Sequence, residues 1–340
     1  MQITIDPLGN FSSRVRECAS EVGKDNFFIP GEIVNGNTNG AIYIGRGKEP
    51  SMKYNNVSDA ITKNDSTYIR EDGHSGLDSG AFHYSTYRAL MRFLGLDGVL
   101  SAAEDAPVNF ADQWQTFVET NDMRNAYDNR FDPRHMYGAS NQDVLRWPGL
   151  INGTERQLLA EFIVTMAMPG IPMVNWGEEQ AFYTLDSTAP DYIFGRQPMA
   201  SAQAWQMHGC YKIGDHNLND WPASNLLHAC KDDTVSLDHR DPSSPLYGVF
   251  KQMFELRERY PVLNDGFLFQ QISAQVDTYK LPGSAGGVTE HGLYSSVRGV
   301  ESGLQDDLTT GHGNQPVWLL YSNRNYTEHY VSDCSDDSSA

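Results

Sequence analysis

The chain has 340 residues, 39% of them hydrophobic, and a formal net charge of −19. This length allows two domains, or one large α/β domain with an extension, and the hydrophobic fraction excludes wholesale disorder because it can form a packed core. The negative charge repels nucleic-acid phosphates and anionic membrane surfaces, so we expect no nucleic acid and no membrane contact within this segment, whereas neutral sugars fit.

Helical and strand-like patterns alternate over residues 1–262. Residues 12–22 are predicted to form a helix, and NFFIPGEI (26–33) a buried strand that ends in one acid, Glu32. The Gly- and Asn-rich stretch 35–79 is longer than an ordinary connection, so it is predicted to be a functional or lid-like excursion. Apolar periodicity then predicts helices over 81–95, 153–168 and 244–260, and strands over 115–122 and 170–179.

The pattern changes near residue 262. Short alternating runs follow, separated by Gly, Asn and Ser clusters: FLFQQI, TYKLP, GLYSSVRG and VWLLYSN. Such runs are typical of an antiparallel sheet. We therefore predict a small antiparallel β domain over residues 263–335 and a tail or linker over 336–340.

Predicted strands that alternate with helices and end in carboxylates favour a parallel α/β barrel. In such a barrel the catalytic groups lie at the carboxyl ends of several strands. Asp122 and Glu178 follow two of the predicted strands, as Glu32 follows another. A doubly wound sheet is the alternative, but no Gly-rich phosphate loop follows a predicted strand.

Two carboxylates are the groups that glycosidic bond cleavage requires. A protonated acid donates to the leaving oxygen, while a carboxylate faces the oxocarbenium-like carbon. Apolar surroundings favour the neutral form of a carboxyl group, and Phe27, Phe28 and Ile29 precede Glu32. Glu32 is therefore the candidate general acid, and an acid at a turn without a chemical role is the alternative.

Three segments resemble motifs of the α-amylase superfamily. FFIPGEI (27–33) resembles its fifth-strand motif, FVETND (117–122) its seventh-strand motif and PGIPMVNWGEEQ (169–180) its eighth-strand segment. The resemblance implies an α/β fold in which residues 1–262 form the C-terminal part of a (β/α)8 TIM barrel, strands five to eight. It also implies Glu32 as the general acid/base and Asp122 as the third carboxylate, which holds substrate hydroxyls and stabilises the transition state.

One residue departs from that pattern. The family usually has a histidine directly before the third carboxylate, where this chain has Asn121. An amide can hydrogen-bond a sugar hydroxyl but cannot become cationic, so the electrostatics of that subsite differ. Trp176, Glu178 and Tyr183 lie at or after the eighth-strand segment and are further candidates for substrate binding, since aromatic rings can stack on sugar faces. Core packing is the alternative for each aromatic residue.

Longer sequence segments point to one family within this superfamily. From about residue 1 to 335 the chain resembles the amylase-like region of fungal cell-wall α-1,3-glucan synthases, as in NDMRNAYDNRFDPRHMYGASNQDVLRWP and SLDHRDPSSPLYGVFKQMFELRERYPVLNDG. Such proteins carry an extracellular amylase-like domain, a cytoplasmic glycogen-synthase-like transferase domain and a multi-pass membrane region. The resemblance implies retaining transglycosylation or hydrolysis of α-glucan at the extracellular face of the plasma membrane or cell wall. It implies no certain cofactor here, since a nucleotide-sugar donor would serve only the transferase domain.

In that family the nucleophilic Asp lies on the fourth strand, and the residues that follow it resemble the beginning of this chain. We therefore expect the nucleophile upstream of Met1, and we interpret Asp6, which Pro7 follows, as a turn or cap residue. Without the nucleophile no covalent glycosyl intermediate can form. The isolated chain is accordingly expected to be an inactive, poorly folded fragment.

Sequons and cysteines favour an extracellular setting. Five N-x-S/T sequons occur, and Cys210 with Cys230 is the favoured disulfide among four cysteines. The first residues lack the basic flank and apolar core of a signal peptide, and we predict no transmembrane segment. Asp72 and Asp78 could bind calcium through oxygen, and His74 another metal through nitrogen, but a solvated loop is the simpler interpretation, so no metal site is assigned.

Two other functions stay open. The chain could be a non-catalytic module that binds α-glucan without turnover, which Asn121 favours. It could also be a fragment of a secreted α-amylase, which would need a signal peptide. The enzyme and the binding module differ in whether Glu32→Gln changes activity or only affinity.

Overall fold

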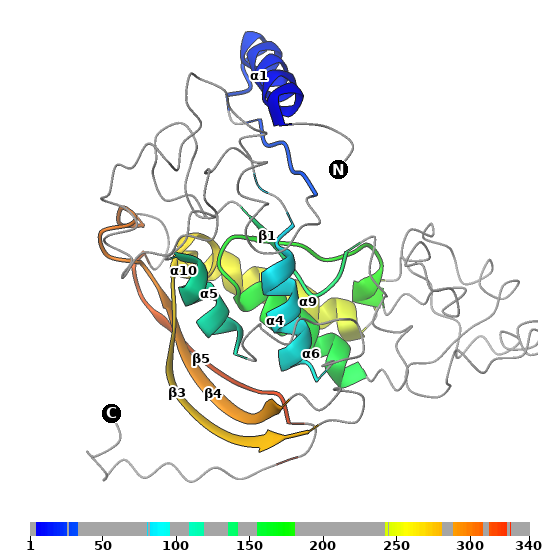
Figure 1. The fold of residues 1–340 in the computed structure, drawn as a ribbon, viewed down its shortest axis with the longest axis vertical. Coiled ribbons are helices and arrows are strands. Elements are labelled where there is room, and N and C mark those ends of the chain that lie inside the picture. Colours follow the sequence, from blue (N-terminus) through cyan, green and yellow to red (C-terminus); the bar gives the residue numbers. More distant parts are fainter. Residues whose placement is uncertain are drawn as a thin grey trace, which may run out of the picture.

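A computed structural model describes residues 5–25, 27–32, 80, 82–95, 109–118, 135–141, 155–180, 242–243, 245–280, 288–308, 313–324 and 327. Within these ranges, a short parallel ladder lies beside a group of helices, and a three-stranded antiparallel sheet curves along one side of the helices (Figure 1). The predicted excursion 35–79 and the tail 336–340 lie outside the described residues.

The first helix, α1 (Ile5–Glu21), begins earlier than the predicted range 12–22. Pro7 lies in its first turn, where a proline is tolerated because the missing N–H has no partner within the helix. The hydroxyl of Ser12 donates to the carbonyl of Gly9 at 3.1 Å, so this side chain bonds inside the helix. In Figure 1, α1 lies at the edge of the described structure, away from the antiparallel sheet.

Extended segments pair in parallel beside one another, beginning with the residues before Glu32. The amide of Gly31 donates to the carbonyl of Gly80 at 3.0 Å, and the amide of Phe82 donates to the carbonyl of Gly31 at 3.3 Å. Phe82 in turn forms a parallel bridge with Met136. The described part of the predicted strand 26–33 therefore pairs at Gly31, but the prediction that it is buried is wrong, because Phe27 is 46% exposed and Glu32 is exposed.

The ladder continues through two short strands. β1 (Met136–Tyr137) pairs in parallel with β2 (Ile171–Pro172), and the amide of Met173 donates to the carbonyl of Tyr137 at 2.7 Å. Between β1 and β2 the chain forms α6 (Glu155–Ala167), so strand, helix and parallel strand follow one another. This connection is the building unit of parallel α/β folds. A closed barrel stays a prediction.

The predicted strand over 115–122 is wrong where the structure describes it. These residues begin inside α5 (Phe110–Val118), while 119–122 lie outside the described residues. Asn109 caps the helix, because its Oδ1 accepts from a backbone amide two residues later at 3.1 Å. Buried side chains recur at helical rather than strand spacing: Phe110, Trp114 and Phe117.

The other predicted helices are confirmed, with shifted ends. α4 (Tyr84–Phe93) is shorter than the range 81–95, because Phe82 and His83 are extended and belong to the parallel ladder. The α6 and α9 (Pro245–Arg259) helices match the predicted ranges closely. Pro261 comes shortly after the end of α9 and begins a short helix, α10 (Pro261–Asp265), since proline fits the first helical position.

Three long strands form the antiparallel sheet in the order β3-β4-β5. They are β3 (Leu268–Tyr279), β4 (Thr289–Gly299) and β5 (Val317–Ser322). The first predicted run from Leu268 on and the first two residues of the second, Thr278 and Tyr279, belong to β3, which has a bulge between Gln271 and Ser273. The antiparallel arrangement of the predicted β domain is thereby confirmed.

One hydrophobic core joins this sheet to the helices. Phe269 of β3 and Tyr294 of β4 belong to the same buried cluster as Phe110 and Trp114 of α5. The indole N–H of Trp114 donates to the carbonyl of Phe267 at 2.8 Å, just before β3. The sheet therefore packs directly on the helical part, and a domain boundary near residue 262 stays a prediction.

A buried arginine on β4 binds the ends of two helices. The guanidinium of Arg298 is fully buried and donates to the carbonyls of Val262 and Gly266, each at 2.9 Å. It also donates to the carbonyl of Ala167, the last residue of α6. Because a helix C-terminus carries partial negative charge, a cation there is stabilising.

A second arginine, on α9, binds the same region. Arg257 is buried and donates to the carbonyl of Met166 at 2.6 Å and to Oδ1 of Asn264 at 2.9 Å. Burial lowers the pKa of Arg257 to about 10. Burial also lowers the pKa of Arg298, and the nearby charge of Arg257 adds to this effect. The two arginines together connect α6, α9, α10 and β4.

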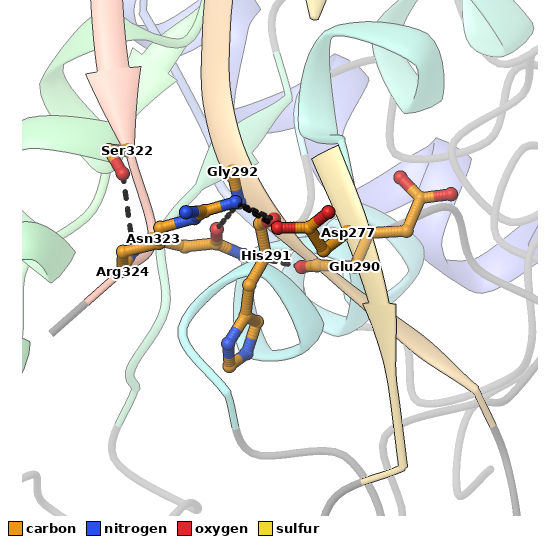
Figure 2. Close-up of polar contacts among 7 residues, drawn as sticks. All are labelled: Asp277, Glu290, His291, Gly292, Ser322, Asn323 and Arg324. Atoms are coloured by element: carbon orange, nitrogen blue, oxygen red, sulfur yellow. Dashed lines mark hydrogen bonds and ion pairs between the residues drawn. The ribbon is translucent and has the colours of Figure 1, made fainter. Parts of the chain in front are cut away.

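Two polar residues just after β5 bind back to the neighbouring strands of the sheet through their side chains (Figure 2). Arg324 reaches across the sheet and forms an ion pair with the exposed carboxylate of Asp277 at 2.5 Å. The side chain of Asn323 accepts from the amide of Gly292 at 2.9 Å and donates to the carbonyl of Glu290 at 2.8 Å. These contacts hold the chain after β5 against β4 and β3.

Candidate active site

Polar and aromatic side chains follow each of the four parallel segments at its carboxyl end. Glu32 follows Gly31, and Tyr84 follows His83. Ser140 and Asn141 come soon after β1, and three residues come soon after β2: Asn175, Trp176 and Glu178. Because the carboxyl ends of parallel strands meet at one edge, these side chains gather there. This edge is the candidate active site.

Tyr84 connects Glu32 to the residues after β1. Its hydroxyl donates to Oε1 of Glu32 at 2.6 Å, and the side-chain amide of Asn141 donates to the same hydroxyl at 3.2 Å. The Tyr84 ring packs edge-on against Phe82, with ring centroids 4.9 Å apart. Glu32 itself is exposed, so its carboxylate can meet a ligand while Tyr84 holds it.

The hydrogen-bond chain continues to the residues after β2. The side-chain amide of Asn175 donates to the backbone carbonyl of Asn141 at 2.9 Å, and both side chains are buried. Oδ1 of Asn175 accepts from the backbone amide of Trp176 at 3.2 Å. Trp176, a predicted substrate contact, is half-buried. This series of hydrogen bonds therefore links Glu32 to the backbone of Trp176.

Glu178 lies inside the protein at the same edge. Its side chain is fully buried, and the hydroxyl of Ser140, also fully buried, donates to Oε2 at 2.5 Å. Glycine is required between Ser140 and β1, because a Cβ on Gly138 would lie 2.1 Å from the carbonyl oxygen of Met173. That close approach brings the two loops together. Substrate binding by Glu178 stays a prediction.

The remaining predicted site residues lie outside the described residues: Asn121, Asp122 and Tyr183. The same holds for the possible metal ligands Asp72, His74 and Asp78, and for the predicted disulfide partners Cys210 and Cys230. Within the described ranges no three His, Cys, Asp or Glu side chains form a metal-binding group. No helix in those ranges is long and apolar enough to cross a bilayer.

Sequence reasoning missed four polar residues of this edge: Tyr84, Ser140, Asn141 and Asn175. The strand before Ser140 has only two residues, which is too short for alternation to be recognised. A usable signal was the small-residue run Gly138-Ala139-Ser140 after an apolar pair, between two helical patterns. Tyr84 was not recognised as a site residue because it also fits the apolar pattern of α4.

The chemistry of the edge suits a neutral, hydroxyl-rich ligand. It combines an exposed carboxylate that can exchange a proton, a phenol hydroxyl, amides and a half-buried indole. Carboxylates provide acid–base catalysis, amides bind hydroxyl groups, and an indole ring offers an apolar face. This is the set of groups that sugar-binding sites use.

Sequence comparison finds close relatives over nearly the whole chain. The cell wall alpha-1,3-glucan synthase mok12 of Schizosaccharomyces pombe is 42% identical over 341 residues, which cover 98% of this chain and 14% of mok12. The synthase ags1 of the same organism is 38% identical and covers 100% of this chain and 14% of its own length. The chain thus spans only 14% of the length of these curated relatives.

A family model matches the C-terminal part of the chain, and solved structures match it with low TM-scores. The model described as Mok13-like, GH beta-sandwich domain, matches residues 267–340. An α-amylase from H. orenii has a TM-score of 0.46 at 12% identity, over 93% of this chain and 54% of the amylase. A cyclic maltosyl-maltose hydrolase from Arthrobacter globiformis has a TM-score of 0.42 at 12% identity, over 86% of this chain and 46% of the hydrolase. At 42% identity over 98% of its residues, the chain is homologous to one segment of the cell wall alpha-1,3-glucan synthase mok12.

Proposed function

We propose that this chain forms part of an amylase-like site that acts on α-glucan chains by retaining transglycosylation or hydrolysis. The site would work within a protein that builds α-1,3-glucan at the cell wall, on the extracellular face of the plasma membrane. The observation that carries the proposal is the exposed Glu32 carboxylate, which Tyr84 holds at the carboxyl edge of the parallel segments. The names of the relatives support the substrate class.

In this proposal Glu32 is the general acid/base. It donates a proton to the glycosidic oxygen as the bond to the sugar breaks, and it later removes a proton from the acceptor hydroxyl. Asp122 holds substrate hydroxyls and stabilises the transition state, while Asn121, Trp176 and Tyr183 bind the sugar. The double displacement also needs a nucleophilic carboxylate, which we do not assign to a residue of this chain. Polymerisation from a nucleotide-sugar donor is assigned to another part of the protein.

The test exchanges the corresponding segment of mok12 for this chain and measures turnover of a maltooligosaccharide. Glu32→Gln should lower kcat by about 100- to 10,000-fold, because the amide cannot exchange the proton. Glu255→Gln, on the exposed face of α9, is the matched control and should leave turnover unchanged. Full turnover by the Glu32 variant would refute the proposal.

A non-catalytic α-glucan-binding module is the second candidate. Asn121, in place of the histidine that the superfamily usually has, favours it. In that case the exchanged protein would bind maltooligosaccharide but release no product, and Glu32→Gln would change only the dissociation constant. Calorimetric titration beside the turnover assay separates the two functions.

A further inference from the structure

Tyr84 is bonded to side chains from both neighbouring segments of the parallel ladder. Its hydroxyl lies 2.6 Å from Oε1 of Glu32 and 3.2 Å from the side-chain nitrogen of Asn141. The nitrogen of an amide can only donate, and a phenol hydroxyl has one hydrogen. The hydroxyl therefore accepts a hydrogen bond from Asn141 and donates its own hydrogen to Glu32. The donor and the acceptor of both hydrogen bonds are thereby fixed.

The surroundings of Tyr84 prevent it from following Glu32 if that carboxylate rotates. Asn141 is buried, and its backbone carbonyl accepts from the buried side chain of Asn175 at 2.9 Å. The Tyr84 ring lies edge-on to Phe82, with centroids 4.9 Å apart, and to Tyr87, with centroids 6.0 Å apart. The hydroxyl is thus a fixed donor beside an exposed acid.

The backbone fixes the spacing of the three segments as well. Phe82 donates to the carbonyl of Gly31 at 3.3 Å on one side, and His83 donates to the carbonyl of Met136 at 3.0 Å on the other. Tyr84 directly follows these two residues, and Glu32 directly follows Gly31. The distance between the phenol and the carboxylate is therefore set by ladder hydrogen bonds.

We propose that Tyr84 is a positioning residue for Glu32, which orients the carboxyl group toward the glycosidic oxygen by donating to Oε1. This inference rests on the proposed function of Glu32 as general acid/base. A phenol hydroxyl can donate to a carboxylate and to the carbonyl oxygen of a protonated acid. Tyr84 therefore serves Glu32 in both halves of the reaction. A small misplacement of a catalytic group lowers the rate by up to about 100-fold.

The test is Tyr84→Phe in mok12 carrying this chain, with two substrates. A maltooligosaccharide needs protonation of its leaving oxygen, whereas a dinitrophenyl α-glucoside has a leaving group that departs without it. We expect kcat/KM to fall by about 10- to 100-fold for the maltooligosaccharide and by less than about threefold for the dinitrophenyl substrate. Glu32→Gln should show the same pattern with a larger difference.

Controls separate this inference from the proposed function. Tyr247→Phe, half-buried on α9, loses a hydroxyl elsewhere and should change neither value of kcat/KM. Equal losses on both substrates, or no loss on either, would overturn the positioning role of Tyr84. No effect of Glu32→Gln would overturn the proposed function instead. Asn141→Ala, which removes the donor behind Tyr84, should give a weaker version of the Tyr84→Phe pattern, and its failure to do so also counts against the inference.

Discussion

Tyr294 and Tyr321 stack with ring centroids 5.7 Å apart and ring planes inclined by only 10°, yet their hydroxyls have different surroundings. The Tyr321 hydroxyl bonds to Ser296 at 2.7 Å and to Asn109 at 3.1 Å. The buried Tyr294 hydroxyl has no hydrogen-bond partner among the described residues. Two similar rings in one core therefore give a matched pair for measuring what a buried hydroxyl contributes.

Removing the two hydroxyls should have different effects on the free energy of unfolding. Tyr294→Phe keeps the packing and deletes an unpartnered buried hydroxyl, so stability should stay equal or rise by about 1 kcal/mol. Tyr321→Phe deletes a hydroxyl that bonds to Ser296 and Asn109 and should cost about 1 to 2 kcal/mol. Urea unfolding of mok12 carrying this chain measures both changes in stability. A larger loss for Tyr294→Phe than for Tyr321→Phe would contradict this assignment.

The two buried tyrosines should make the stability of the fold sensitive to alkaline pH. Burial, as the largest cause, raises the pKa of Tyr294 and of Tyr321 above the ordinary value. In the unfolded chain a tyrosine ionises near pH 10, so the unfolded state loses protons first as the pH rises. The stability contributed by each neutral tyrosine is complete below that value and is lost as the pH rises above it.

We therefore expect the melting temperature to fall steeply above about pH 10, and to fall less steeply in Tyr294→Phe. Thermal unfolding from pH 8 to 11 checks this, with the tyrosine absorbance at each pH as an internal record of ionisation. If the melting temperature falls equally steeply with pH in the parent chain and in Tyr294→Phe, Tyr294 does not contribute to the loss of stability at alkaline pH.

Ser140→Ala should destabilise the candidate site, because the buried carboxylate of Glu178 loses the hydroxyl that donates to it. The expected cost is about 1.5 to 3 kcal/mol, the range for hydrogen bonds to charged groups. Ser13→Ala, at an exposed position on α1, is the matched change and should cost far less. If the two variants unfold at the same urea concentration, the bond to Glu178 contributes little.

Arg298→Met should destabilise the chain by about 3 to 5 kcal/mol, even though it replaces a buried charge by an apolar side chain. The reason is that the carbonyls of Val262, Gly266 and Ala167 lose a shared donor. Arg259→Met, at an exposed position at the end of α9, is the control. A stability equal to that of the parent chain would mean that water replaces the guanidinium at these carbonyls.

The sequence predicts those elements whose side chains repeat often enough to reveal a period. The α6 and α9 helices and the antiparallel sheet are long and periodic, and their prediction is confirmed. The α5 helix was mistaken for a strand because Phe117 and Val118 were read together with the polar residues that follow, not with the helical spacing from Phe110. Strands of two residues carry no period at all.

The candidate site was predictable in part. Glu32 stands out because it ends an apolar run, and Trp176 because it ends another. Tyr84 and Asn141 do not stand out, because their role depends on contacts across 52 and 57 residues of chain. Such contacts arise from the register of the parallel ladder, which no local pattern contains.

The shared binding of α6 by Arg298 and Arg257 has a consequence for how the molecule opens. The carbonyls at the end of α6 bond to the guanidinium of Arg298 from β4 and to that of Arg257 from α9. The sheet therefore cannot separate from α6 without leaving the buried Arg298 short of a partner, and α9 cannot separate without doing the same to Arg257. Local opening of either part alone is therefore disfavoured. In hydrogen exchange, the amides of β4 and of α6 should exchange together, at a common rate set by one cooperative unit.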